Sequence, residues 1–242
     1  MLFYSVARTH VGCRRKVNED AFLSRPEIGL WAVADGMGGH HAGEVASALI
    51  VDLLGTCQTG VSLPARMEAA RAALLDANEQ LIAMTRRDTA HRPIGSTVVA
   101  MGADAGSFAC LWVGDSRAYL ARDGRLLQLT QDHSLVQELI EIGYIDPSEA
   151  RAHPNGNVIT RAIGSEPTLN IDAVDGKIAN GDAFLLTSDG LTRLVSDEEI
   201  LASLMSADLE SAADNLIDTC LARGAPDNVT FVILRTRQGL TE

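Results

Sequence analysis

The sequence predicts an α+β fold in which helices cover antiparallel sheets, and two observations carry that prediction. Short apolar runs are joined by tight turns, such as those at residues 104–106 and 123–124, which require antiparallel pairing of the strands that they connect. The longer helical segments come in adjacent pairs and do not alternate with single strands. Grouped hairpins and grouped helices argue against repeated βαβ units. No linker, repeat or low-complexity tract divides the chain, so one domain over residues 1–242 is expected.

The strands are predicted from short apolar segments bounded by turn residues. They are expected at residues 3–8, 21–24, 30–34, 96–102, 108–113, 118–121, 126–129, 183–187 and 229–234.

The helices are predicted from apolar side chains spaced three and four residues apart, as around Leu74 and Leu81. Ser196 and Glu199 have the spacing of a capping box, which indicates a helix start. The expected helices cover residues 43–54, 64–87, 197–205 and 209–223.

The segment over residues 132–165 is rich in turns and interrupts this scheme. A short amphipathic helix is expected within it at residues 135–142. Long irregular excursions from a compact domain are often lids or recognition elements. We therefore expect a lid here and call residues 132–165 the flap segment. His133, inside it, is expected to be a surface residue.

The charge balance excludes some partners. Lys plus Arg number 20 against 32 Asp plus Glu, a formal net charge of −12, and the basic residues are scattered, which argues against nucleic-acid binding. No apolar run approaches the length that spans a bilayer. The four cysteines are widely spaced, as in a chain from a reducing compartment. We expect a cytoplasmic monomer with neither nucleic acid nor a membrane as partner.

Acidic residues fall at the ends of the predicted strands. Asp35, Asp115 and Asp189 follow three of them, and Asp20 and Asp227 precede two others. Each acid alone is best explained as a turn residue. Together they predict a cation site, because carboxylates gathered on one rim repel one another unless a cation neutralises them. With no cluster of Cys or His nearby, such oxygen ligands suit Mg²⁺ or Mn²⁺ better than Zn²⁺.

Several motifs, in this order and spacing, resemble those of the protein phosphatase 2C family, most closely its short bacterial members. They extend over essentially the whole chain. The motifs are Arg15 to Asp20, Asp35-Gly-Met-Gly-Gly-His40 with Ala42-Gly-Glu44, Gly95-Ser-Thr97, Val113-Gly-Asp-Ser-Arg117, Thr187-Ser-Asp-Gly-Leu191 and Asp227-Asn-Val-Thr230.

The resemblance implies a four-layer α-β-β-α sandwich with two central antiparallel sheets. It also implies hydrolysis of phosphoserine and phosphothreonine in phosphorylated proteins by direct attack of hydroxide held at a binuclear Mn²⁺ or Mg²⁺ centre, with an opposing serine/threonine kinase as a partner in signalling. Asp35 is expected to bridge both ions, Gly36 to give its backbone carbonyl, Asp20 to lie on the same side, Asp189 and Asp227 to hold the other ion, and Glu19 to bind a metal-bound water.

Arginine and histidine candidates complete the expected site. Arg15 is the candidate for phosphate, because its planar fork matches two phosphate oxygens. His40 fits the family pattern and is favoured over His41 as the general acid that protonates the leaving oxygen. Arg161 is a candidate for substrate binding, with a structural ion pair as the equal alternative.

A third, weaker ion is expected from the resemblance at Asp115 together with Asp189. Many relatives carry another acid where this chain has Arg193. An arginine there would repel the third cation or pair with either aspartate.

Two other functions remain open from the residues. A catalytically silent phosphoprotein-binding scaffold would be expected to lose the metal-binding acids, which are present here. A two-metal phosphodiesterase would use similar acids, but the net charge of −12 argues against a polyanionic substrate.

Overall fold

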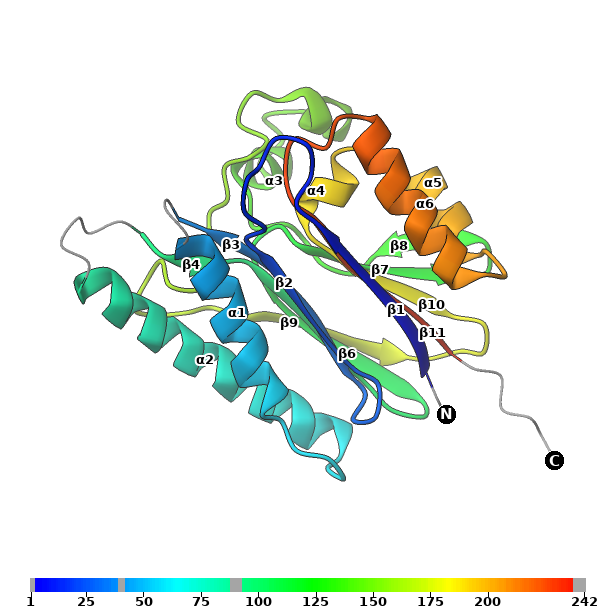
Figure 1. The fold of residues 1–242 in the computed structure, drawn as a ribbon, viewed down its shortest axis with the longest axis horizontal. Helices are drawn as coiled ribbons and strands as arrows, with labels where there is room; N and C mark the ends of the chain where they lie inside the picture. Colours follow the sequence, from blue (N-terminus) through cyan, green and yellow to red (C-terminus); the bar gives the residue numbers. More distant parts are fainter. Residues whose placement is uncertain (1–2, 39–41, 88–92, 237–242) are drawn as a thin grey trace.

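The computed structural model describes residues 3–38, 42–87 and 93–236 (Figure 1). Its helices are α1 (Ala42–Gly55), α2 (Leu63–Arg87), α3 (Leu135–Glu141), the 3-10 helix η1 (Pro147–Ala152), α4 (Asp189–Thr192), α5 (Asp197–Leu204) and α6 (Leu209–Ala222). Its strands are β1 (Phe3–His10), β2 (Asp20–Arg25), β3 (Leu30–Met37), β4 (Gly95–Ser96), β5 (Val98–Ala103), β6 (Ser107–Val113), β7 (Arg117–Arg122), β8 (Arg125–Gln128), β9 (Asp172–Lys177), β10 (Ala183–Thr187) and β11 (Val229–Thr236).

The strands form two sheets with antiparallel pairing throughout the described ladders. The five-stranded sheet has the order β1-β11-β10-β7-β8. The six-stranded sheet has the order β2-β3-β5-β6-β9, with β4 paired to β3. The first and the last strands of the described residues are therefore neighbours in one sheet, because β1 pairs with β11.

The two sheets lie face to face, with α1 and α2 outside one and α5 and α6 outside the other (Figure 1). The stacking of helices and sheets creates three buried apolar layers, and strand β3 contributes to two of them. Leu30 and Ala32 pack toward the α1 and α2 side, while Trp31 and Val33 pack between the sheets. A third cluster joins β10 and β11 to α5 and α6 through residues such as Phe231. The expected four-layer α+β sandwich is confirmed.

Most elements begin and end close to the predicted positions. The capping box of Ser196 and Glu199 is present at the start of α5. The predicted strand at 96–102 is divided at Thr97, which separates β4 from β5. Helix α4, directly after β10, was not predicted because four residues give too little periodicity to detect.

Strand β9 was missed by the sequence analysis. It is an edge strand that pairs with β6 alone in the described sheet, and its residues alternate between intermediate and exposed positions. Its two aspartates and a glycine give a weak apolar pattern, so the backbone ladder with β6 defines this strand more than its side chains do.

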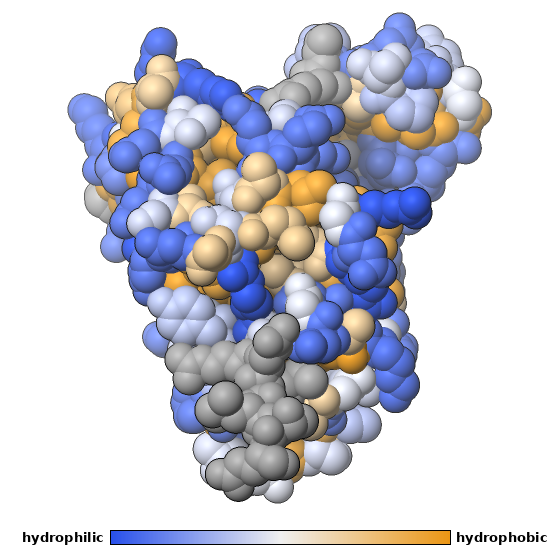
Figure 2. Space-filling model, turned by 90° about the vertical axis from the view of Figure 1, so that its right-hand side faces the viewer, coloured by the Kyte–Doolittle hydropathy of each residue, from blue (hydrophilic) through white to orange (hydrophobic). Residues whose placement is uncertain are grey.

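Among the described residues, no helix is long and apolar enough to cross a membrane. Figure 2 shows one face of the molecule, on which apolar side chains gather near the centre while hydrophilic ones dominate the margins. Among the described residues, the large apolar side chains with the greatest exposure lie in the flap segment, at Ile142 and Tyr144, which are 75% and 77% exposed. All four cysteines are free, and three of them are buried, as expected for a chain with reduced thiols.

Candidate active site

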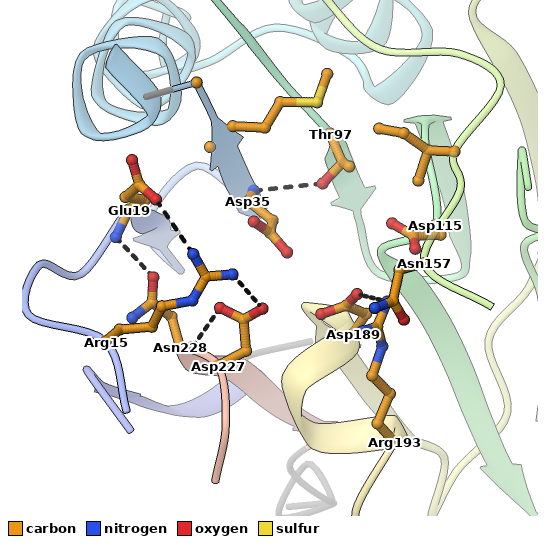
Figure 3. A pocket seen from close by; sticks show the side chains of 14 residues that line it. Arg15, Glu19, Asp35, Thr97, Asp115, Asn157, Asp189, Arg193, Asp227 and Asn228 are labelled. Atoms are coloured by element: carbon orange, nitrogen blue, oxygen red, sulfur yellow. Dashed lines mark hydrogen bonds and ion pairs between the residues drawn. The ribbon is translucent and has the colours of Figure 1, made fainter. Parts of the chain in front are cut away.

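A pocket of about 440 Å³ lies where the loop after β1, the end of β3, helix α4 and the flap segment meet. Figure 3 shows the carboxylates of Asp35, Asp115, Asp189 and Asp227 around a common space. The pocket is lined by Arg15, Glu19, Asp35, Gly36, Met37, Gly38, Thr97, Asp115, Asn157, Ile159, Asp189, Arg193, Asp227 and Asn228.

Two of the predicted metal ligands face each other across neighbouring strands. Asp20 in β2 is the cross-strand partner of Asp35 in β3. Like charges placed directly opposite on a sheet are destabilising. Gly36 follows, and a Cβ at this position would lie 1.9 Å from the carbonyl oxygen of Gly43, so a glycine is needed for this close approach of helix α1. The register therefore places two carboxyl groups next to each other at this end of the sheet, with Asp35 in the pocket lining.

The burial of these carboxyl groups disfavours their charged forms. Burial, with the nearby charges of Asp189 and Asp227, raises the pKa of Asp20 to about 7. Burial, followed by repulsion from the surrounding aspartates, raises the pKa of Asp35 well above its ordinary value. Burial and the charge of Asp189 likewise raise the pKa of Asp115 to about 7. The pocket is thus a place where added positive charge would be strongly favoured.

Buried carboxylate oxygens without hydrogen-bond partners show that these residues fit a divalent cation. Oδ1 of Asp20 and Oδ1 of Asp189 are both buried and unpartnered. Such orphaned oxygens are costly unless a cation or a proton satisfies them. Among the described residues, no three His, Cys, Asp or Glu side chains converge on a single point. The acids are distributed around the pocket, an arrangement that their mutual repulsion favours. Carboxylate oxygens are hard ligands, which suit Mg²⁺ or Mn²⁺.

Asp189 is positioned by the junction of β10 and α4. Ser188 is the N-cap of α4, and its hydroxyl donates a hydrogen bond of 2.8 Å to Oδ2 of Asp20. That bond joins the two sheets at the pocket. Arg193, one helical turn after Asp189, forms an ion pair of 2.5 Å with it. Burial raises the pKa of Asp189, and the guanidinium of Arg193 opposes that shift.

Asp227 lies shortly before β11 and lines the same pocket. Arg15 donates to its Oδ2 over 2.7 Å, and the second amino group of Arg15 lies 4.0 Å from Glu19. The side chain of Asn228 accepts a 2.8 Å hydrogen bond from the backbone N–H of Glu19 and donates to the carbonyls of Val11 and Val17. Asn228 thereby holds the loop that presents Arg15 and Glu19.

Thr97 connects two of the acidic strands. Its hydroxyl accepts from the backbone N–H of Asp35 over 3.3 Å and shares a 2.7 Å hydrogen bond with the hydroxyl of Ser116. The residue after Asp115 is therefore fastened to the strand that carries Asp35. The sequence analysis assigned no role to Thr97 or Asn228, although both stand in the motifs, because their hydrogen bonds reach distant segments.

The structure brings most of the predicted site residues to this pocket, and Asp20 lies next to Asp35 in the neighbouring strand. It does not bring Arg161 there: the guanidinium of Arg161 donates to Asp172 over 3.0 Å, which is the alternative ion pair. His40 and His41 lie outside the described residues. The flap segment contributes Asn157 and Ile159 to the lining, two residues that the sequence analysis did not single out.

The expectation that His133 is a surface residue was wrong. Its exposed fraction is 5%, and its ring stacks on Trp112 with centroids 6.0 Å apart. The position of His133 in a turn-rich polar segment suggested exposure. The flap segment folds back on the end of β6 at this point, and a contact of that kind between distant segments has no local signal in the sequence.

The two-sheet fold and the pocket lined with aspartates agree with the family resemblance of the sequence motifs. Residues 12–223 match the protein phosphatase 2C family. The chain belongs to this family.

Three relatives place it more closely. PppA of Pseudomonas aeruginosa, described as a key regulatory component of the T6SS, has a solved structure with 41% identity and a TM-score of 0.89, covering 97% of this chain and 98% of that one. The serine/threonine protein phosphatase PstP of Mycobacterium tuberculosis is 39% identical over 94% of this chain, which spans 44% of PstP. A structure of the PstP catalytic domain holds two manganese ions, with a TM-score of 0.86 and 35% identity, covering 97% of this chain and 98% of that one. The protein phosphatase PhpP of Streptococcus pneumoniae is 34% identical, covering 93% of this chain and 94% of PhpP.

Proposed function

We propose that this chain is a protein serine/threonine phosphatase that hydrolyses phosphoserine and phosphothreonine in phosphorylated proteins. One observation carries the proposal: Asp35, Asp189 and Asp227 surround the same pocket as Arg15, the candidate for binding phosphate. Carboxylates alone would repel a phosphate, so the pocket requires cations if it is to hold one. Membership of the family supports the activity, since the relative PstP is a serine/threonine protein phosphatase.

Two Mn²⁺ or Mg²⁺ ions, when bound, supply an acidified water and offset the charge of the phosphoryl group. Asp35 and the backbone carbonyl of Gly36 would hold one ion, with Asp20 next to Asp35 in the neighbouring strand, and Asp189 and Asp227 would hold the other. The two manganese ions of PstP support this number and type of metal. Glu19, whose carboxylate lies 4.0 Å from the guanidinium of Arg15, would orient a water at the same centre.

Arg15 is the residue that this chain offers to the substrate phosphate. Its side chain is 48% exposed, so the guanidinium is accessible from the pocket. A guanidinium has five N–H donors, and the hydrogen bond to Asp227 engages one of its amino groups. Arg15 can therefore bind phosphate oxygens with its remaining donors. Arg161 takes part in substrate binding only if it leaves its partner Asp172.

His40 is proposed as the general acid, on the Asp-Gly-Met-Gly-Gly-His pattern of the sequence. Protonation matters most for a poor leaving group such as the threonine alkoxide. His40→Ala is therefore expected to slow hydrolysis of a phosphothreonine peptide more than that of p-nitrophenyl phosphate. His41→Ala is the matched control, and a selective loss there would transfer the role to His41.

The decisive experiment compares two substrates with and without metal. Turnover of a phosphothreonine peptide is expected in Mn²⁺ or Mg²⁺, to be abolished by EDTA and to return when metal is added back. An oligonucleotide is expected to remain uncut under the same conditions. Full activity after exhaustive chelation would refute the metal-dependent mechanism. Binding of the phosphopeptide without turnover would instead indicate a silent scaffold.

The proposed partners are a serine/threonine kinase and its phosphorylated substrates, with one chain as the catalytic unit and the cytoplasm as the setting. The regulatory role stated for PppA supports a partner in signalling, and the four free cysteines support a reducing compartment. Phosphoproteomics of cells that carry Asp189→Asn in place of the native chain would identify the substrates, because their phosphorylation should rise.

A further inference from the structure

The buried side chain of His133 lies at a junction of three segments: the end of β6, the start of the flap segment and the edge strand β9. Its Nδ1 accepts a 3.0 Å hydrogen bond from the backbone N–H of Gly114. Its Nε2 lies 3.1 Å from Oδ2 of Asp172 in β9. Trp112, whose ring stacks on His133, donates to the carbonyl of Gln131 over 2.8 Å. Both ring nitrogens are thus engaged by partners from different parts of the chain.

These partners determine the tautomer of the ring. A backbone N–H can only donate, so Nδ1 must carry no proton where it meets Gly114. In a neutral imidazole the proton then resides on Nε2 and is donated to the carboxylate of Asp172. Burial lowers the pKa of His133 below its ordinary value in spite of this carboxylate, which favours the neutral ring. Arg161 donates to the other oxygen of Asp172 and keeps it an acceptor.

His133 holds the peptide groups on both sides of Gly114. Besides the bond to the ring, the carbonyl of Gly114 accepts from the backbone N–H of His133 over 3.0 Å. Gly114 has a φ of +104°, and a Cβ there would lie 2.5 Å from the methyl group of Thr97, so its conformation is restricted to glycine. The next residue is Asp115, which is buried and lines the pocket. The direction of the Asp115 side chain therefore depends on this clamp.

The same histidine orders the base of the flap segment. Its carbonyl accepts from the backbone N–H of Thr160 over 2.8 Å, and the neighbouring Ser134 forms a β-bridge with Ile159. Ile159 and Asn157 line the pocket from the flap side. A displacement of His133 would move Asp115 and these two flap residues together.

We propose that His133 is a positioning residue that holds Asp115 and the flap residues Asn157 and Ile159 in register across the pocket, in the Nε2-protonated tautomer that Asp172 selects. The expected effect of His133 on turnover rests on the proposed phosphatase function. The tautomer of His133 and its hydrogen bonds to Gly114 are independent of that function.

The first test is spectroscopic and needs no substrate. In ¹⁵N NMR of the full chain, the His133 ring is expected to show an unprotonated Nδ1 and a protonated Nε2, and the Gly114 amide is expected to exchange slowly. Asp172→Asn presents an amide that competes for the opposite tautomer, so it should shift the ring signals and speed exchange at Gly114. An Nδ1-protonated ring in the native chain, or unchanged Gly114 exchange in Asp172→Asn, would overturn the proposal.

The second test uses a matched pair of substitutions at His133. Asn places an oxygen acceptor near the position of Nδ1, whereas Gln places an N–H donor near Nε2 and lacks the acceptor. With saturating Mn²⁺, His133→Gln is expected to lower kcat on a phosphothreonine peptide about tenfold, as for residues that orient metal ligands, while His133→Asn restores most of it. His153→Gln, in the same flap segment, is the control with native kcat.

Equal losses of kcat in His133→Asn and His133→Gln would overturn the role of the Gly114 bond, as would a loss in His133→Gln with native exchange at Gly114. If the native chain itself lacks phosphatase activity, the proposed function fails, and the spectroscopic test still decides whether His133 clamps Gly114.

Discussion

Two pairs of aspartates contribute to one pocket but have different electrostatic partners. Asp20 and Asp35 face each other across β2 and β3, and the hydroxyl of Ser188 donates a hydrogen bond to Asp20. Asp189 and Asp227 each pair with an arginine, at 2.5 Å and 2.7 Å. The chain thus compensates charge with its own side chains on one side of the pocket. On the other side the charge remains for a bound cation to neutralise.

The largest effect is expected from removing one acid of each pair. Asp35→Asn and Asp189→Asn should each lower turnover by more than about a hundredfold, because loss of a metal ligand should exceed the 10- to 100-fold effects of groups that only orient ligands. Their metal-free stabilities should differ. Asp35→Asn relieves repulsion and should raise Tm, whereas Asp189→Asn also breaks the pair with Arg193.

Steady-state kinetics at saturating Mn²⁺ and thermal unfolding in EDTA would measure both effects. Native turnover in either variant would remove that aspartate from the site. An equal rise of Tm in the two variants would contradict the proposed electrostatic difference between the pair Asp20 and Asp35 and the pair Asp189 and Asp227.

Arg15 is the next largest test, because it neutralises Asp227 and is proposed to bind substrate phosphate. Charge-assisted hydrogen bonds are each worth about 1.5–3 kcal/mol, so Arg15→Ala should lower kcat/KM about 10- to 100-fold for every phosphate ester. Arg15→Lys keeps the charge but loses the planar fork, and should recover part of the loss. Arg14→Ala, at the adjacent arginine, is the control. An equal loss of kcat/KM in Arg14→Ala would mean that phosphate binding is not specific to Arg15.

A smaller effect is expected on the pH dependence of stability without metal. The folded pKa values of Asp20 and Asp115 are raised to about 7 from the ordinary 3.8. Between these limits the folded state binds more protons than the unfolded state, so stability falls as the pH rises from about 4 to 7. Tm in EDTA should drop by several degrees over this range, and less in Asp115→Asn. A Tm that rises with pH would contradict the raised pKa values of Asp20 and Asp115.

The smallest effect concerns the third ion. Arg193 occupies the side of the pocket where Asp115 and Asp189 lie, and its charge lowers the pKa values of both, against the effect of burial. A third Mn²⁺ should therefore bind the native chain only weakly, and Arg193→Asp should gain affinity for it in a calorimetric titration. Asp115→Ala should lower turnover and spare the two core ions. If Arg193→Asp gains no affinity for a third Mn²⁺, Arg193 does not weaken binding of that ion.

The sequence by itself determined the class of fold and most of the acids of the site. Apolar segments of strand length, paired helices and the capping box at Ser196 are local signals, and they were confirmed. The acids at strand ends were also visible, because in an antiparallel sheet the end of one strand and the start of its neighbour share an edge. The roles of the individual site residues remain predictions.

Only the tertiary structure decided which groups meet. The pairing of Arg15 with Asp227 joins opposite ends of the chain, and the packing of His133 joins the flap segment to β6 and β9. The register that opposes Asp20 to Asp35 depends on the turn between β2 and β3. Strand β9 likewise exists through its ladder with β6 and has little apolar pattern of its own. Such contacts depend on how whole layers pack against one another. Local periodicity carries no information about them, because it records which face a side chain takes and not which partner it finds there.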